Sequence, residues 1–152
     1  MFNIRVYGIL VNEKKQVLVS DEFIRGMYIT KFPGGGLEPG EGTRDCLSRE
    51  FMEEMNLQVE VTEHLYTTDF YQQSAFNPSH QIISIYYFVN PLEPIAVPLR
   101  DKVFDFDEQQ MKTYDETGET ETFRFVDLDE FSEAALSLPI DKIVASLLKE
   151  KL

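Results

Sequence analysis

Residues 34–57 read GGGLEPGEGTRDCLSREFMEEMNL, and this stretch decides the fold that the rest of the chain must support. Its glycines and proline predict a turn, and the residues after them predict an α-helix. Glu50, Glu53 and Glu54 stand at positions i, i+3 and i+4 and therefore share one face of that helix. Like charges at this spacing repel each other and weaken an isolated helix. A cation would relieve this repulsion, and carboxylate oxygens suit hard cations such as Mg²⁺ or Mn²⁺.

The other face of the same helix is apolar. Leu47, Phe51 and Met55 recur every four residues, which predicts a stripe that is buried against the core. Thr43 is the expected N-cap, because its hydroxyl can accept a hydrogen bond from the first turn. Asn56 is expected to end the helix, because asparagine is the second choice after glycine for the left-handed conformation found there.

The glycines and charged residues of this stretch together resemble the Nudix box, GX5EX7REUXEEXGU, in which U is an apolar residue. The matching positions are Gly35, Glu41, Arg49, Glu50, Phe51, Glu53, Glu54 and Leu57. The late glycine of the pattern is Asn56 here, which can end the helix in the same way. The alternative interpretation is a solvated acidic helix face, but it does not explain why the charges keep a fixed register over residues 35–57.

The resemblance implies an α/β fold of the Nudix type, which is an α/β/α sandwich with a mixed sheet between helices. It implies a single domain over residues 1–152. It also implies a metal-dependent enzyme that cleaves a nucleoside diphosphate linked to another moiety, by attack of water on phosphorus. The expected cofactor is Mg²⁺ or Mn²⁺, since such ions stabilise charge on phosphate oxygens and lower the pKa of bound water.

The family's metal ligands carry over residue by residue. Glu53 and Glu54 would be the principal ligands. Glu50 would be a further ligand or would orient the attacking water. The backbone carbonyl of Gly34 or Gly35 would complete the coordination.

Two further roles follow from the resemblance. Arg49 would reach back to Glu41 and fix the loop on the helix, with direct phosphate contact as the alternative. Many family members add a carboxylate from a later loop as ligand or general base. Glu119 and Glu121 are the candidates here, and Glu121 is favoured because it adjoins the last predicted strand.

Substrate recognition is less sharply marked. Bases stack on aromatic rings and arginine planes, so the candidate substrate-binding residues are those in predicted loops and strand ends: Arg25, Tyr28, Phe70, Tyr71 and His80. The proline that ADP-ribose-type enzymes tend to carry after the box is absent, and so is the SQPWP-like marker of NADH-type enzymes. This favours a (d)NTP-type substrate, as in the MutT group. An ADP-ribose or nucleotide-sugar pyrophosphatase, or a catalytically silent nucleotide-sensing module, is the alternative.

The composition indicates which classes of binding partner are favoured and which are disfavoured. The chain has 152 residues, 43 % of them hydrophobic, and a net charge of −13. Such acidity disfavours nucleic-acid polymers and anionic membranes but allows a small metal-bound nucleotide. No run approaches the ~20 apolar residues of a membrane span, and the N-terminus lacks a signal-peptide pattern. The single cysteine, Cys46, excludes an internal disulfide, so a cytoplasmic protein is expected, and the resemblance allows a homodimer.

Alternation and turn residues predict the other elements. Strands are expected over residues 3–11, 16–20, 27–32, 57–68, 81–90, 102–106 and 121–126, with the second returning on the first as a hairpin. Loops are expected over residues 21–26 and 72–80, and a loop or hairpin over residues 108–121. The apolar strand over residues 81–90 is expected to be central and buried on both faces. A short helix capped by Asp127 or Asp129 is expected to run through Leu136 and to be ended by Pro139. An amphipathic helix is expected after it, with an apolar face formed by Ile140, Ile143, Val144, Leu147 and Leu148.

Overall fold

The structure is a computed structural model that describes residues 1–152. Contacts divide the chain into two units, Met1–Leu10 with Pro33–Ala96 and Val11–Phe32 with Val97–Leu152. The chain passes between the units after Leu10, after Phe32 and after Ala96, so neither unit is a continuous segment. That residues 1–152 form a single domain stays a prediction.

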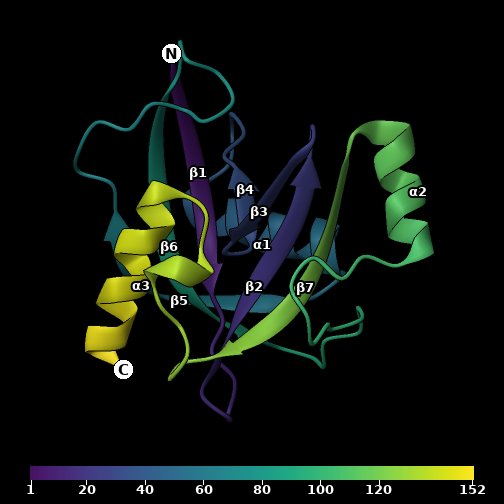
Figure 1. The fold of residues 1–152 in the computed structure, drawn as a ribbon. Coiled ribbons are helices and arrows are strands. Elements are labelled where there is room, and N and C mark those ends of the chain that lie inside the picture. Colours follow the sequence, from purple (N-terminus) through teal and green to yellow (C-terminus); the bar gives the residue numbers. More distant parts are fainter. The chain divides into compact units, whose positions relative to one another are not determined.

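A mixed sheet of four strands in the order β4-β1-β6-β5 is the frame of the first unit (Figure 1). The strands are β1 (Phe2–Ile9), β4 (Gly34–Gly36), β5 (Val59–Thr67) and β6 (Gln81–Pro91). Strands β1 and β6 are parallel, whereas β4 and β5 run antiparallel to their neighbours. The predicted central position of residues 81–90 is confirmed. The predicted burial on both faces is confirmed in part, because Ser84 and Tyr86 are buried on one face and Val89 on the other, while the rest of residues 81–89 is half-buried.

Helix α1 (Thr43–Met55) packs its apolar stripe into the first unit as predicted. Leu47, Phe51 and Met55 are each at most 1 % exposed. Gly8 of β1 makes room for this packing, because a Cβ there would lie 2.6 Å from the Phe51 ring. The helix is therefore held at a fixed depth on the strand beneath it.

The two ends of α1 differ in how well the sequence predicted them. Asn56 ends the helix in the left-handed conformation (φ 50°, ψ 41°), and its N–H donates to the Met52 carbonyl, as predicted. The prediction of Thr43 as N-cap is wrong. The cap is Gly42, and Thr43 is the first helical residue. Its hydroxyl instead bonds the Tyr87 hydroxyl of β6 at 2.7 Å, which fixes the start of the helix on the sheet.

A separate antiparallel sheet of three strands in the order β3-β2-β7 is the frame of the second unit. The strands are β2 (Gln16–Ile24), β3 (Met27–Lys31) and β7 (Glu119–Asp127). The predicted hairpin between residues 3–11 and 16–20 is wrong, because β2 pairs with β3 and β7. The loop predicted over residues 21–26 is also wrong, since β2 continues to Ile24. Its charged Asp21 is tolerated in a buried strand because Arg124 Nε lies 2.6 Å from its carboxylate.

Helix α2 (Glu108–Thr117) replaces most of the loop or hairpin predicted over residues 108–121. Asp107 and Gln110 form a reciprocal capping box, and Gly118 ends the helix with φ 84°. No residue of α2 is buried, so the apolar periodicity that usually reveals a helix is missing.

The C-terminal segment is partly as predicted. Helix α3 (Pro139–Lys151) is present, with Ile140, Val144 and Leu148 of the predicted apolar face buried. Leu147 is half-buried, and the predicted burial of Ile143 is wrong because its side chain is exposed. The short helix expected before it is only a 3₁₀ turn, η1 (Glu133–Ala135), and Pro139 begins α3 instead of ending a helix. The strand predicted over residues 102–106 is absent from the structure. The α/β class with a mixed sheet is confirmed, and none of the helices has the length and apolar character needed to cross a bilayer.

Candidate active site

Arg49 ties the turn before α1 to the helix itself. Its Nε and Nη2 donate to the two carboxylate oxygens of Glu41 at 3.0 and 2.7 Å. Nη2 also donates to the Gly36 carbonyl at 3.1 Å. The predicted contact between Arg49 and Glu41 is therefore present, and the bidentate geometry is the strong form of this pairing.

The remaining nitrogen of the same guanidinium serves three more carboxylates. Arg49 Nη1 lies 3.1 Å from Glu50, 3.2 Å from Glu53 and 3.8 Å from Glu38. Hydrogen bonding to Glu41, followed by the charge of Glu50, raises the pKa of Arg49. The arginine thus offsets the like-charge repulsion that the sequence predicts for this face of α1.

Glu41 gives the network a pH dependence. Its hydrogen bond from Arg49 lowers its pKa from 4.5 to about 2. A carboxyl whose pKa is lower in the folded state stabilises the fold above the unfolded value, and this contribution is lost as the pH falls through the folded value. We therefore expect the wild-type protein to lose more thermal stability than Glu41→Gln between pH 5 and pH 2. Calorimetry over this range measures the difference, and parallel losses in the two proteins would contradict it.

The Glu50 carboxylate packs against the backbone of Gly35. A Cβ on residue 35 would lie 2.5 Å from both Cδ and Oε1 of Glu50, so only glycine leaves room for this carboxylate. Glu50 is 12 % exposed and keeps one oxygen on Arg49. A carboxylate is thus packed directly against the backbone of the glycine turn.

The donors on this face fit a hard divalent cation by their chemistry, since carboxylate and carbonyl oxygens are its preferred ligands. Glu53 is 58 % exposed and can turn, whereas Glu50 is 12 % exposed and packs against Gly35. The side chains of residues 1–152 do not form a ready cluster of three metal-binding groups. Two of the acids on this stripe, Glu50 and Glu53, are engaged by Arg49.

Cys46 lies beside this network without being a reactive group. Its side chain is fully buried, and burial raises the pKa of the thiol to about 12. A thiol with so high a pKa holds almost no thiolate near neutral pH. Cys46 therefore acts as a small packed side chain of α1.

Glu121 lies in strand β7 of the second unit and not in a loop. The Ser20 hydroxyl donates to its carboxylate, and the Lys31 ammonium lies 3.6 Å from the same oxygen. Glu119, the other candidate, begins the strand and is exposed. The sequence pattern did not predict Ser20 and Lys31 as partners of Glu121. If the alternation of β2 is extended beyond Ser20, it places Ser20 and Glu22 on one face of the strand.

The comparison with known proteins identifies the family. A family model described as the NUDIX domain matches residues 1–147. The chain belongs to the Nudix family. It is a Nudix-type hydrolase, an enzyme that acts on a phosphoric anhydride. No curated protein matches the sequence.

Solved structures share the Nudix fold predicted from the sequence. A NUDIX hydrolase from Nitrosomonas europaea superposes with a TM-score of 0.70 at 18 % identity, covering 99 % of this chain and 90 % of that one. The MutT protein from Methanosarcina mazei Go1 gives 0.64 at 16 % identity, covering 98 % and 91 %. An ADP-ribose pyrophosphatase from Streptococcus suis gives 0.60 at 17 % identity, covering 98 % and 90 %.

Two of the substrate-binding candidates of this Nudix hydrolase lie in the β2–β3 hairpin. Arg25 occupies the turn with φ 48°, and its N–H donates to the Gly118 carbonyl. Tyr28 is 56 % exposed, but its ring already stacks on Phe23 at 4.2 Å between centroids. The same ring also contacts Phe104 at 5.0 Å between centroids, so Tyr28 is already part of an aromatic cluster.

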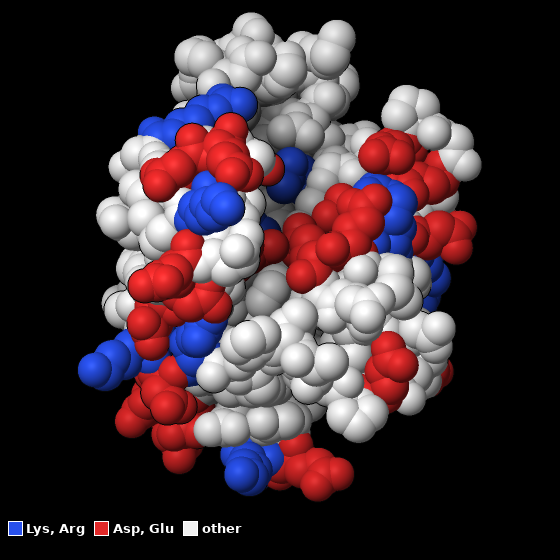
Figure 2. Space-filling view, turned by 90° about the vertical axis from the view of Figure 1, so that its right-hand side faces the viewer, with Lys and Arg blue, Asp and Glu red and all other residues white.

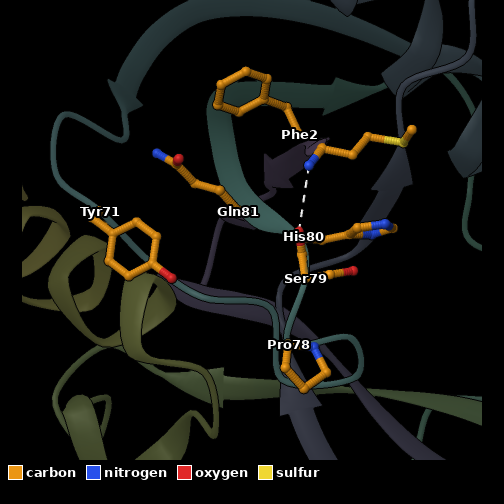
Figure 3. A pocket seen from close by; sticks show the side chains of 7 residues that line it. Phe2, Tyr71, Pro78, Ser79, His80 and Gln81 are labelled. Carbon is orange, nitrogen blue, oxygen red and sulfur yellow. Dashed lines mark hydrogen bonds between the residues drawn. The ribbon is translucent and has the colours of Figure 1, made fainter.

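The other three candidates lie in or beside the loop before β6 in the first unit. Tyr71 and His80 line a hollow of about 200 Å³ together with residues of the chain start. Figure 3 shows their rings well separated. Phe70 is 37 % exposed and does not line the hollow. The structure therefore brings two of these three residues to one depression but does not make them face each other.

Acidic side chains outnumber basic ones on the surface. Figure 2 shows uncharged residues over most of one face, with several patches of acidic side chains and fewer basic ones among them, as expected for 27 Asp and Glu against 14 Lys and Arg. A surface of this sign repels polyanions.

Proposed function

We propose that this Nudix hydrolase is a Mg²⁺- or Mn²⁺-dependent pyrophosphohydrolase that cleaves a nucleoside diphosphate linked to another moiety, with a (d)NTP-type substrate favoured. The observation that carries the proposal is the Glu50 carboxylate seated on Gly35, beside two further glutamates on the same helix face. Rigid placement of carboxylates is what a divalent-metal site needs.

Within this proposal Glu53 and Glu54 are the principal metal ligands. Glu50 is a further ligand or orients the attacking water, and the carbonyl of Gly35 completes the set. A divalent cation held there would neutralise charge on the pyrophosphate oxygens and lower the pKa of bound water. Arg49 has a positioning role, because its bonds to Glu41 and Gly36 hold the glycine turn on the helix.

The reaction is a displacement at phosphorus. The water oxygen forms a bond to phosphorus, the anhydride P–O bond breaks, and the leaving phosphate keeps the bonding electrons. We assign the proton released by the water to Glu121 as general base, which is the role that the family resemblance implies for a carboxylate outside the box. Its fixation by Ser20 and Lys31 supports this assignment.

Two observations bear on the substrate class. The missing markers of the ADP-ribose and NADH types favour a (d)NTP, whereas the similarity to a protein described as an ADP-ribose pyrophosphatase keeps that substrate as the alternative. Arg25, Tyr28, Phe70, Tyr71 and His80 are proposed to contact the substrate. The proposal places the enzyme in the cytoplasm, acting on a small molecule, with no nucleic-acid polymer or membrane as partner and with homodimer formation open to test.

A substrate screen tests the proposal. Purified protein is incubated with Mg²⁺, with Mn²⁺ and with EDTA, against canonical and oxidised (d)NTPs, ADP-ribose, nucleotide sugars and dinucleoside polyphosphates. We expect hydrolysis that requires a divalent cation and is fastest on a (d)NTP, with products separated by ion-exchange chromatography. Metal-dependent cleavage of ADP-ribose alone would overturn the substrate assignment, and no cleavage of any compound would overturn the proposed activity.

A further inference from the structure

Three strands of the second unit bring a serine, a lysine and a glutamate together on one face of their sheet. Ser20 of β2 is paired with Lys31 of β3, and Glu22 of β2 is paired with Glu121 of β7. Because side chains alternate along a strand, Ser20 and Glu22 share a face, and the carboxylate of Glu121 reaches diagonally to Ser20. Nothing in the Nudix box accounts for this cluster.

The cluster leaves the Glu121 carboxylate little freedom. One of its oxygens, Oε2, accepts from Ser20 and lies 3.6 Å from Lys31 Nζ. Both partners are buried, with Ser20 fully covered and Lys31 5 % exposed. The backbone carbonyl of Glu121 also accepts from Gln110 Nε2 at 3.2 Å, so the residue is held at both its main chain and its side chain.

The cluster keeps its carboxylate within reach of solvent. Glu22 stands opposite Glu121 on the neighbouring strand, and like charges at such positions are unfavourable unless a cation offsets them. The Lys31 ammonium, 3.6 Å from Glu121, is such a cation. The Glu121 side chain stays 18 % exposed, so the cluster holds an accessible carboxylate in one orientation.

We infer that Ser20 and Lys31 are positioning residues that hold Glu121 for the hydrolytic reaction. The inference rests on the proposed function, in which Glu121 accepts the proton of the attacking water. Lys31 is also close in sequence to the glycine turn, with only Phe32 and Pro33 between it and Gly34. The strand that places the lysine therefore leads directly into the Nudix box.

A double-mutant cycle in kcat tests the inference, using Lys31→Met, Glu121→Gln and both together. General-base catalysis contributes roughly 10²–10⁴-fold, so Glu121→Gln is expected to lower kcat at least about 100-fold. Lys31→Met should lower kcat about tenfold by loosening the base, with KM changed less than about twofold. In the Glu121→Gln background, Lys31→Met should have no further effect, because it acts through the missing carboxylate.

Thr30→Val is the matched control. Thr30 neighbours Lys31 on the same strand but points to the other face, where its hydroxyl bonds Asp21 at 2.7 Å. The Thr30→Val substitution removes one buried hydrogen bond and should lower the melting temperature without changing kcat. Ser20→Ala is the second variant, to be used if Lys31→Met does not fold, and it should give the same non-additivity with Glu121→Gln.

The outcomes separate the inference from the proposed function. Losses in kcat that multiply in the double mutant, or a kcat unchanged by Glu121→Gln, would overturn the inference while metal-dependent hydrolysis still stands. A fall in kcat for Thr30→Val equal to that for Lys31→Met would reduce the cluster to a structural role. A wild-type protein that cleaves nothing in the substrate screen would overturn both.

Discussion

Glu53→Gln is expected to reduce kcat at least about 100-fold, since even changes beside metal ligands typically cost about 10–100-fold. The amide is neutral and binds hard cations poorly, so the proposed metal site would lose a principal ligand. The fold should survive. Glu53 is 58 % exposed, and its contact with Arg49 is a helical i, i+4 pair, which contributes less than about 1 kcal/mol.

The matched control for this loss is Glu38→Gln. Glu38 is another exposed glutamate near Arg49, at 3.8 Å, but it lies on the turn outside the acidic stripe of α1. Kinetics at saturating Mg²⁺ and at saturating Mn²⁺, together with circular dichroism melts, compare the two variants with wild type. Equal losses in both variants, or full activity in Glu53→Gln, would remove Glu53 from the proposed ligands.

Gly34→Ala is expected to destabilise the protein by more than about 4 kcal/mol, or to prevent folding, because two named causes of severe destabilisation coincide. Gly34 has φ +150°, which residues with a side chain rarely adopt. A Cβ there would also lie 2.1 Å from the Val6 carbonyl oxygen and 2.8 Å from the Tyr7 Cα. Both neighbours are backbone atoms of β1, so neither can rotate away.

Gly36→Ala provides the comparison from the same short strand. A Cβ on Gly36 would meet only Arg5 Nη1, at an ordinary 3.7 Å. Denaturant unfolding of the two variants should therefore give a large loss of stability for Gly34→Ala and a small one for Gly36→Ala. Similar midpoints would mean that β4 can shift away from β1.

Some features were predictable because a local pattern encodes them completely. The stripe of Leu47, Phe51 and Met55 and the stop at Asn56 follow from helical periodicity and from left-handed preference, and both are confirmed. The contact from Arg49 to Glu41 followed from the family pattern and is also present. The metal-ligand and catalytic assignments stay predictions. The contacts that hold these residues in place are made with other residues of the chain, so they do not reveal which side chains bind a metal or a substrate.

Other features depended on distant partners and were missed. The irregular pattern of residues 21–26 predicts a loop, whereas β2 continues there because Arg124 of β7 neutralises the buried Asp21. Because the predicted strand ends at Ser20, the prediction does not include Glu22 in the strand and does not group Ser20, Lys31 and Glu121. Helix α2 was missed although Asp107, Gln110 and Gly118 carry capping signals, because its lack of buried residues removes the apolar period.

The three passages of the chain between its two units have a consequence for dissecting this protein. A fragment that ends anywhere between residues 33 and 80 keeps β2 and β3 but lacks β6, and it also lacks β7, which pairs with β2 along its whole length. A fragment that begins there lacks β1, the strand between β4 and β6. Neither half then retains a complete sheet. Two halves that are expressed separately and mixed should therefore fail to restore the protein unless they fold together.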